Sequence, residues 1–304
     1  MEGTAVNRQQ LIGGAIVFLG AILFSAKAVI VKLAYRYEID SISLLALRFS
    51  FALPFYLFAN WYLRRRTLKP SVLTSKDWFQ VAFVGIIGYY LASLLDFLGL
   101  QYITASMERL ILFLYPTIVV LISYVFLKKP IQRNQVLALI LTYIGIGLAF
   151  YQGLQLSGQP NFALGGILVF LCAIAYAFYL IGSGELIPKM GAIRFTALAL
   201  SFSSIAILLH HLLVYQWDLF HFHPMVYFYS FIMAVIATVI PSFMVSEGIR
   251  RIGASNASIV GSVGPISTII LAYIFLGERL GNLQILGTVI VIGGVLVITL
   301  SKKR

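Results

Sequence analysis

The chain has 304 residues, of which 61% are hydrophobic and only 11% are charged, and its mean hydropathy is +0.96. Because a soluble domain has about 45–50% apolar and about 25% charged residues, this composition excludes a secreted enzyme, a coiled coil and a disordered chain. The single cysteine, Cys172, excludes a disulfide framework, an iron–sulfur cluster and a zinc ribbon. The sequence therefore predicts an all-α polytopic membrane protein.

Runs of mostly apolar residues, each near the length of about 20 residues that a helix needs to cross a bilayer, recur along the chain. Ten such runs are bounded by charged or turn residues: Leu11–Leu33, Ser41–Leu63, Trp78–Leu100, Ala105–Leu127, Asn134–Tyr151, Phe162–Ser183, Phe195–Tyr215, Pro224–Val245, Ala254–Leu276 and Leu283–Ser301. The first run is longer than the apolar part of a signal peptide and lacks a small-residue cleavage site, so we interpret it as a transmembrane helix. The sequence predicts ten such helices.

The basic residues indicate the orientation of these helices. With the N-terminus inside, 16 of the 22 Lys and Arg residues fall in the predicted inner segments, and the outer loops hold only Arg36 and Arg279. Both termini are therefore predicted to be cytoplasmic. The formal net charge of +12 is explained by this topology, and we expect no nucleic-acid partner.

Two stretches of the first half recur in the second half. The run LIGGAIVFLGAI resembles ALGGILVFLCAI, 152 residues later, and Pro116 with its neighbours recurs 149 residues later around Pro265. The chain is therefore predicted to be a five-helix unit written twice, over residues 1–152 and 153–304. Because five is odd, the second unit is inverted in the membrane. Inverted repeats are typical of secondary transporters, which hold the substrate between the repeats near the midplane.

A longer pattern in the second repeat resembles the EamA-type branch of the drug/metabolite transporter superfamily. The pattern "AS…P…LGE-rl…G…GG" is carried by Ala254-Ser255, Pro265, Leu276-Gly277-Glu278-Arg279-Leu280, Gly287 and Gly293-Gly294, and the Arg-Phe of the second span by Arg48-Phe49. The chain departs from the family at Phe24-Ser25, where Trp-Gly is common, and at Lys128-Lys129, where Gly-Glu is usual. The resemblance covers essentially the whole chain. It implies a ten-helix transporter of small organic solutes, often outward and often proton-coupled, without specifying the substrate.

Charged residues inside a bilayer are costly and suggest function by default. The predicted spans of the first repeat contain Lys27, Arg48, Asp96, Glu108 and Arg109. Counting from the outer turns at about 1.5 Å per residue places these five charges, which four helices carry, at one level in the outer half of the membrane. In one interpretation Asp96 or Glu108 carries the coupling proton and the cations hold a substrate carboxylate. In the other, these residues form structural ion pairs, which is the stronger alternative for Arg48.

Helix breaks and mid-membrane side chains give two further sets of candidates. Prolines free a backbone carbonyl and kink a helix, so three of them are candidate hinges, although packing explains them equally well: Pro116, Pro265 and Pro241. Aromatic and hydroxyl side chains near mid-membrane are predicted to line a cavity suited to an amino acid or another amphipathic metabolite: Tyr89, Tyr90, Tyr176, Tyr179, Ser258 and Ser262.

Other site classes receive less support. Four histidines flank the loop near Asp218, but their spacing fits no tight zinc pattern, so no metal site is predicted. The sequence has no Walker loop, CxxC or HExxH pattern, and we expect no cofactor and no enzymatic activity.

The sequence thus predicts a secondary active transporter in the inner or plasma membrane, exporting small organic metabolites such as amino acids by alternating access. Its expected partners are a small-molecule substrate, the lipid bilayer and protons, and a monomer suffices because both repeats lie in one chain. One alternative is a nucleotide-sugar or other anionic-metabolite exchanger, favoured by the excess of cations over acids inside the spans. Alternatives from another class are a membrane-embedded lipid-modifying enzyme and a passive structural subunit.

Overall fold

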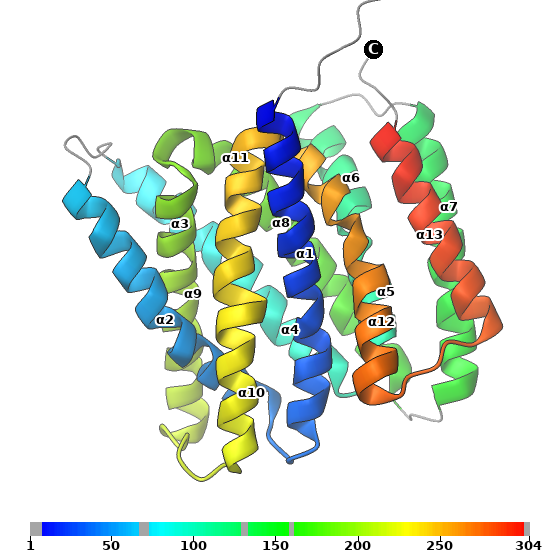
Figure 1. Ribbon diagram of the computed structural model, residues 1–304, viewed down its shortest axis with the longest axis horizontal. Helices are drawn as coiled ribbons and strands as arrows, with labels where there is room; N and C mark the ends of the chain where they lie inside the picture. The colour runs from blue at the N-terminus through cyan, green and yellow to red at the C-terminus, as the bar shows by residue number, and fades with distance from the viewer. Residues whose placement is uncertain (1–7, 67–72, 129–132, 158–160, 301–304) are drawn as a thin grey trace, which may run out of the picture.

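The computed structural model describes residues 8–66, 73–128, 133–157 and 161–300, and these residues form helices joined by short turns, with no strand among them. The helices are α1 Arg8–Tyr35, α2 Ser41–Arg66, α3 Ser75–Gly85, η1 Ile86–Leu91, α4 Ala92–Leu100, α5 Ala105–Leu112, α6 Tyr115–Leu127, α7 Arg133–Ser157, α8 Phe162–Met190, α9 Ala192–Tyr215, α10 Pro224–Ala234, η2 Val235–Val239, α11 Ile240–Val260, η3 Gly261–Val263, α12 Gly264–Leu276 and α13 Asn282–Leu300. They form one bundle, in which the start of α1 and the end of α13 lie at the same end (Figure 1).

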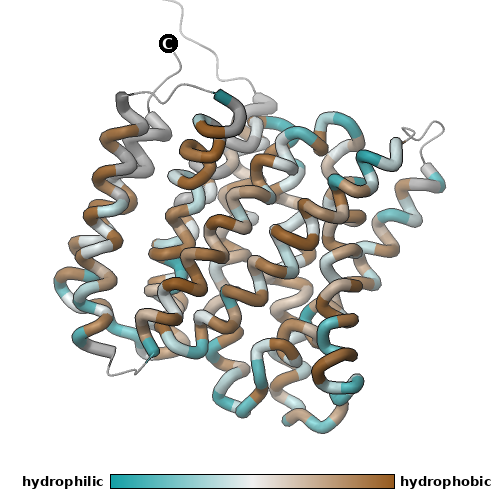
Figure 2. Tube along the Cα trace, turned by 180° about the vertical axis from the view of Figure 1, so that it is seen from behind, coloured by the Kyte–Doolittle hydropathy of each residue, from teal (hydrophilic) through white to brown (hydrophobic). Residues whose placement is uncertain are grey.

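Seven helical segments of the described residues are long and apolar enough to cross a membrane: Leu11–Tyr35, Ser41–Leu63, Ser75–Leu100, Ala105–Ile122, Phe162–Met190, Ala192–Tyr215 and Pro224–Gly253. Two shorter apolar helices follow, Gly264–Leu276 and Asn282–Gly293. Apolar residues cover the outside of the bundle, and hydrophilic residues gather towards its two ends (Figure 2). Large apolar side chains such as Phe79 and Leu213, 70% and 82% exposed, are expected where lipid replaces water. The count of ten spans and their inversion stay predictions.

Helices far apart in sequence pack side by side in this bundle. The pairs α1–α11 and α2–α9 run through its centre and one flank, and α7 packs on α13 at the other edge (Figure 1). Glycines bring α7 and α13 into close contact, since a Cβ placed on Gly145 would lie 2.5 Å from the carbonyl oxygen of Gly287. Small residues at such contacts are the usual way for membrane helices to associate, because packing and not water exclusion drives their contact.

We expect Gly145→Ala to destabilise the folded protein by about 1–3 kcal/mol, because the added methyl group overlaps backbone that cannot rotate away. Gly147→Ala is the matched control, two residues along the same helix, where an added Cβ meets nothing within 4 Å. Thermal unfolding of the two purified variants in the same detergent checks this. Equal melting temperatures for the two variants would show that the α7–α13 contact is looser than described.

Among the described residues, the three turns η1, η2 and η3 and the break between α5 and α6 interrupt the succession of α-helical turns. The π-helical turn η1 lies between α3 and α4, and η2 lies between α10 and α11, 149 residues further along the chain. That spacing equals the smaller of the two offsets, 152 and 149 residues, in the predicted internal repeat. Each of the three predicted hinge prolines lies in the first turn of the helix that follows an interruption: Pro116 in α6, Pro241 in α11 and Pro265 in α12. π-helical turns often occur at functional sites.

Candidate functional site

A cavity of about 100 Å³ lies inside the bundle, level with the middle of α1. Its walls come from two parts of the chain, residues 17–115 and residues 172–265, so both predicted repeats contribute. Three of its lining side chains are cationic, Lys27, Arg48 and Arg109, and most of the others are aromatic or aliphatic. The cavity therefore combines positive charge with apolar surface.

Two buried acids lie behind the cations of this cavity. The Lys27 ammonium lies 2.6 Å from an Asp96 carboxylate oxygen and 3.8 Å from a Glu108 oxygen, and Arg109 Nε lies 3.8 Å from the other Glu108 oxygen. Asp96 and Glu108 are fully buried and do not line the cavity, whereas Lys27 and Arg109 do. We call these four residues the charge cluster. The structure thus brings four of the five predicted intramembrane charges into direct contact, with two acids sharing one ammonium.

Arg109 also ties three helices together next to the cavity. Its Nη2 donates to the carbonyl oxygen of Phe24 in α1 at 3.1 Å, and its Nε donates to Thr268 Oγ1 in α12 at 3.0 Å. Thr268 in turn donates to the Ser25 carbonyl oxygen at 3.1 Å, and Ser25 Oγ donates to the Gly264 carbonyl oxygen at 3.0 Å. Any movement of α12 against α1 must therefore rearrange the hydrogen bonds of the charge cluster.

Arg48, the fifth predicted charge, stands apart from the charge cluster. It is only 1% exposed, and its Nε donates to Thr238 Oγ1 in η2 at 2.7 Å. The guanidinium carbon lies 5.1 Å from the ring centroid of Phe49 and 5.5 Å from that of Phe97, at cation–π distance. Its contact with η2 joins residues 190 positions apart, which links α2 to the second half of the chain.

The predicted cavity-lining tyrosines divide into two groups. Tyr89 of η1 and Tyr176 of α8 line the cavity. Tyr179 lies behind them, 4.9 Å from the ring of Tyr89 and 5.9 Å from that of Tyr176, and Tyr90 is hydrogen-bonded to His210 Nδ1 at 3.0 Å. Of the three candidate hinges, Pro265 lines the cavity, and Pro116 and Pro241 do not. The side chains of Ser258 and Ser262 lie outside the described part of the chain.

Several lining residues were not predicted. The aromatic residues Phe24, Phe113 and Tyr115 line the cavity together with Ser93 and Cys172. An isolated aromatic residue in a uniformly apolar run looks the same whether it faces lipid, another helix or a cavity, so the sequence offers no pattern that selects these five. The π-helical turn η1 marks this region in the structure, but hydrophobic periodicity in a uniformly apolar run does not reveal such a turn.

A third acid, Glu278, links the two halves of the chain at one end of the bundle. Glu278, which follows α12, accepts hydrogen bonds from the backbone N–H groups of Ala105 and Ser106 at 2.8 and 3.0 Å and from Ser106 Oγ at 2.7 Å. Its carboxylate thus caps α5, where the helix dipole favours negative charge. At the same end, Tyr35 donates to the Phe97 carbonyl oxygen at 2.7 Å. These bonds join α1, α4, α5 and the end of α12.

We expect Glu278→Ala to destabilise the protein by about 1–3 kcal/mol, since it leaves partly buried N–H groups of α5 without an acceptor. Arg279→Ala is the matched control at the exposed neighbouring position. The difference in unfolding free energy between the two variants measures the cap. If Glu278→Ala were no less stable than Arg279→Ala, the link between α12 and α5 would contribute nothing to the fold.

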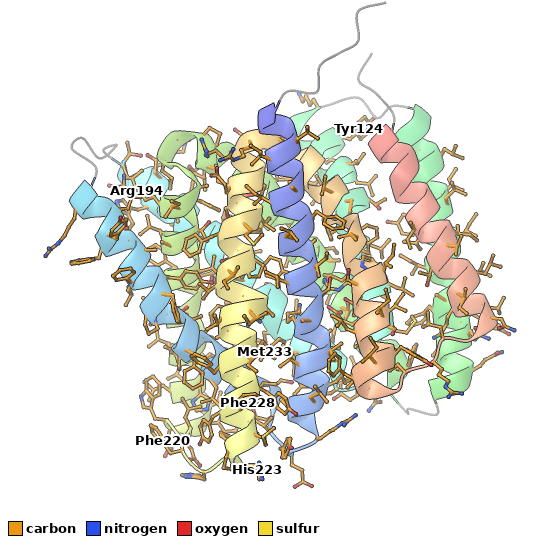
Figure 3. All side chains as sticks on the ribbon, in the orientation of Figure 1. Tyr124, Arg194, Phe220, His223, Phe228 and Met233 are labelled. Carbon is orange, nitrogen blue, oxygen red and sulfur yellow. The ribbon has the colours of Figure 1, made fainter. Side chains whose placement is uncertain are left out.

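The histidines near Asp218 lie at the same end of the bundle, away from the charge cluster. His221 pairs with Asp218, and His223 stacks on Tyr37 with 4.6 Å between ring centroids. Figure 3 shows His223 and Phe220 at the end of the bundle opposite to Arg194. The described residues contain no group of three or more metal-ligating side chains.

Comparisons with known proteins agree on one family. The sequence profile of the EamA-like transporter family matches residues 11–151 and 163–300. The chain is 30% identical over 284 residues to the uncharacterized transporter YcbK of Bacillus subtilis, with 92% of this chain and 90% of that protein covered. It is 23% identical to the uncharacterized transporter YetK of the same organism, over 96% of this chain and 84% of the relative.

One solved structure shows the same fold. A protein crystal structure superposes with a TM-score of 0.68 over 95% of this chain and 96% of that chain, at 16% sequence identity. The similarity covers the whole helical bundle and carries no information on the solute.

Proposed function

Because the chain belongs to the EamA-like transporter family of the drug/metabolite transporter superfamily, and is therefore an integral membrane transporter, we propose that it is a proton-coupled secondary exporter of small organic metabolites such as amino acids. The solute occupies the central cavity, and the charge cluster carries the proton. The transporter has ten spans in two inverted repeats, residues 1–152 and 153–304, with both termini cytoplasmic. It functions as a monomer and has no nucleic-acid partner.

The observation that carries this proposal is the position of the charge cluster at the wall of the cavity. Lys27 and Arg109 contact both the cavity and the buried acids, so a solute that reaches the cations changes the electrostatic environment of Asp96 and Glu108. A proton on either acid weakens its attraction for Lys27. Proton uptake and solute binding therefore act on the same ammonium group, which is the requirement for coupling.

The arrangement at one end of the bundle supports alternating access. On α1, the cavity is lined between Val17 and Lys27, and the turn beyond, at Tyr35, is hydrogen-bonded to α4. Glu278 holds α12 against α5 at that end. In the proposed topology this end is the outer one, so the arrangement corresponds to a conformation closed to the outside. The two family matches, one in each half of the chain, support the division into repeats.

Flux measurements in liposomes containing only this protein test the proposal. Labelled pools of amino acids, amines and organic anions, including nucleotide sugars, are loaded separately, with and without an imposed pH gradient at clamped membrane potential. We expect export of one pool above that from empty liposomes and acceleration by the gradient. Flux that does not change with the pH gradient would contradict proton coupling. If the folded protein transported none of the pools, the proposal that its solute is an amino acid, an amine or an organic anion would be contradicted.

The second candidate function is exchange of anionic metabolites. It is favoured by a specific observation, namely that three cations and no carboxylate are among the described residues that line the cavity. In this case one anion leaves while another enters, and the charge cluster serves to hold the cations in place. Acceleration of labelled-anion export by unlabelled anion outside, without any effect of pH, would distinguish exchange from proton coupling.

A further inference from the structure

Arg48 differs from the other two cations of the cavity in its bonding. Lys27 lies against Asp96, and Arg109 donates to Thr268 and to the Phe24 carbonyl oxygen while facing Glu108. Arg48 has no carboxylate within 4.0 Å among the described residues, and its buried Nη1 has no hydrogen-bond acceptor among them. A buried guanidinium nitrogen without an acceptor is costly, so this position favours an acceptor that comes from outside the chain.

The guanidinium is nevertheless held in one place. Its Nε donates to Thr238, and the rings of Phe49 and Phe97 lie at cation–π distance. Thr238 is itself held, because its hydroxyl donates to the Met233 carbonyl oxygen at 2.8 Å across the π-helical turn η2. The orientation of the guanidinium is therefore set before a ligand arrives, which lowers the entropy cost of binding.

The charges around the cavity favour an anion over a zwitterion. The three cations face two acids, Asp96 and Glu108, which leaves one positive charge uncompensated when both acids are ionised. Both acids are fully buried behind Lys27, and no described lining residue is acidic. Among the described lining residues, a solute ammonium group would find hydroxyl groups and aromatic faces but no carboxylate, whereas a solute carboxylate would find Arg48.

We propose that Arg48 is the solute-binding residue of this transporter and that the cavity selects a small monocarboxylate, with the carboxylate on the guanidinium and the apolar part against Phe24, Tyr89 and Tyr176. This inference rests on the proposed function for the identity of the site, and within the small organic metabolites proposed there it selects acids over zwitterionic amino acids. The cavity volume of about 100 Å³ limits the size of the acid. It is smaller than the cavity of about 150 Å³ that accommodates benzene in an apolar protein core.

Binding of matched small molecules to the purified full-length protein tests this inference without any gradient or transport. The probes are propionate, propionamide and propylamine, and butyrate, butyramide, butylamine and 4-aminobutyrate, measured by calorimetry in detergent. We expect the wild type to bind at least one acid roughly tenfold or more tightly than its amide, amine or zwitterionic analogue, as for a hydrogen bond to a charged group. Arg48→Met removes this difference, and Arg65→Met, an exposed position on the same helix, keeps it.

Further variants keep the test decisive. Arg48→Lys retains the positive charge but loses the planar guanidinium, which can bind a carboxylate through two hydrogen bonds. We therefore expect the preference of this variant for the acid to be reduced and not abolished. If Arg48→Met fails to fold, Thr238→Val, which removes the acceptor of Nε, is expected to weaken acid binding severalfold. Equal binding of acids and amines by the wild type, no binding of any acid, or an unchanged preference in Arg48→Met would overturn the inference. Acid binding without solute flux would instead contradict the transport proposal and leave the binding site standing.

Discussion

Asp96→Asn and Glu108→Gln are each expected to abolish solute accumulation driven by a pH gradient while leaving the protein folded. Both acids are fully buried, and both lie within 4 Å of the Lys27 ammonium. Protonation of either acid therefore weakens the electrostatic attraction that holds Lys27 in place. An amide cannot exchange the proton, and the gradient then has no group on which to act. In either variant the pH gradient should no longer accelerate solute flux.

The control for this prediction is Glu185→Gln, which makes the same chemical change at an exposed position on α8. Solute exchange in the absence of a gradient should persist in all three variants if the acids serve only the proton. Undiminished gradient-driven flux in both Asp96→Asn and Glu108→Gln would remove these residues from the coupling mechanism.

Lys27→Met is expected to have the second-largest effect, a loss of about 3–5 kcal/mol in the free energy of unfolding. The substitution leaves Asp96 without the ammonium that lies 2.6 Å away and leaves Arg109 as the nearest cation to Glu108. An uncompensated buried carboxylate is far more costly than the loss of an exposed ion pair. Reversible unfolding in mixed micelles measures the effect, with Lys76→Met, at an exposed position in the first turn of α3, as the control.

A double variant separates charge from packing in this prediction. Lys27→Met combined with Asp96→Asn removes both partners, so we expect it to recover a substantial part of the stability lost in Lys27→Met alone. If the losses of the two single variants simply added, the 2.6 Å contact would contribute no coupling energy, and the charge cluster would have to be held by other contacts.

The positions of the buried charges could be predicted from sequence because helix geometry is regular. A fixed rise per residue placed Lys27, Asp96 and Glu108 at one level, and the structure brings the three side chains together. The partners of Arg48 could not be predicted in this way. Its contact with Thr238 depends on how α2 packs against a helix 190 residues away, and no local pattern reports that packing.

The tyrosines illustrate a second limit of sequence periodicity. Tyr89 and Tyr90 are adjacent in η1 and, like consecutive residues of any helix, present different faces: Tyr89 lines the cavity and Tyr90 bonds to His210. A π-helical turn inserts an additional residue into the helix and shifts the face that each following side chain presents. Because every residue from Ile86 to Leu91 except Gly88 is apolar or aromatic, the sequence gives no indication of the turn.

The extent of the helices was predicted more reliably than their interruptions. The predicted run Ala105–Leu127 corresponds to α5 and α6, which are separated at Phe113 and Leu114, and the run Ala254–Leu276 is interrupted by η3. Both interruptions precede a proline that had been predicted as a hinge, Pro116 or Pro265. The family pattern contained Glu278, but its role in capping α5 became evident only from the contact between two segments 172 or 173 residues apart.

Proton movement accompanying solute transport is the most direct test of the central claim, which is that solute and proton meet at the charge cluster. Liposomes containing the purified protein and an entrapped pH-sensitive dye are loaded with the transported solute at clamped potential. The account predicts that solute leaving the liposomes brings protons in, at a rate proportional to solute flux, and that Glu108→Gln abolishes this proton entry. Solute export at the full rate with no change in internal pH would contradict it.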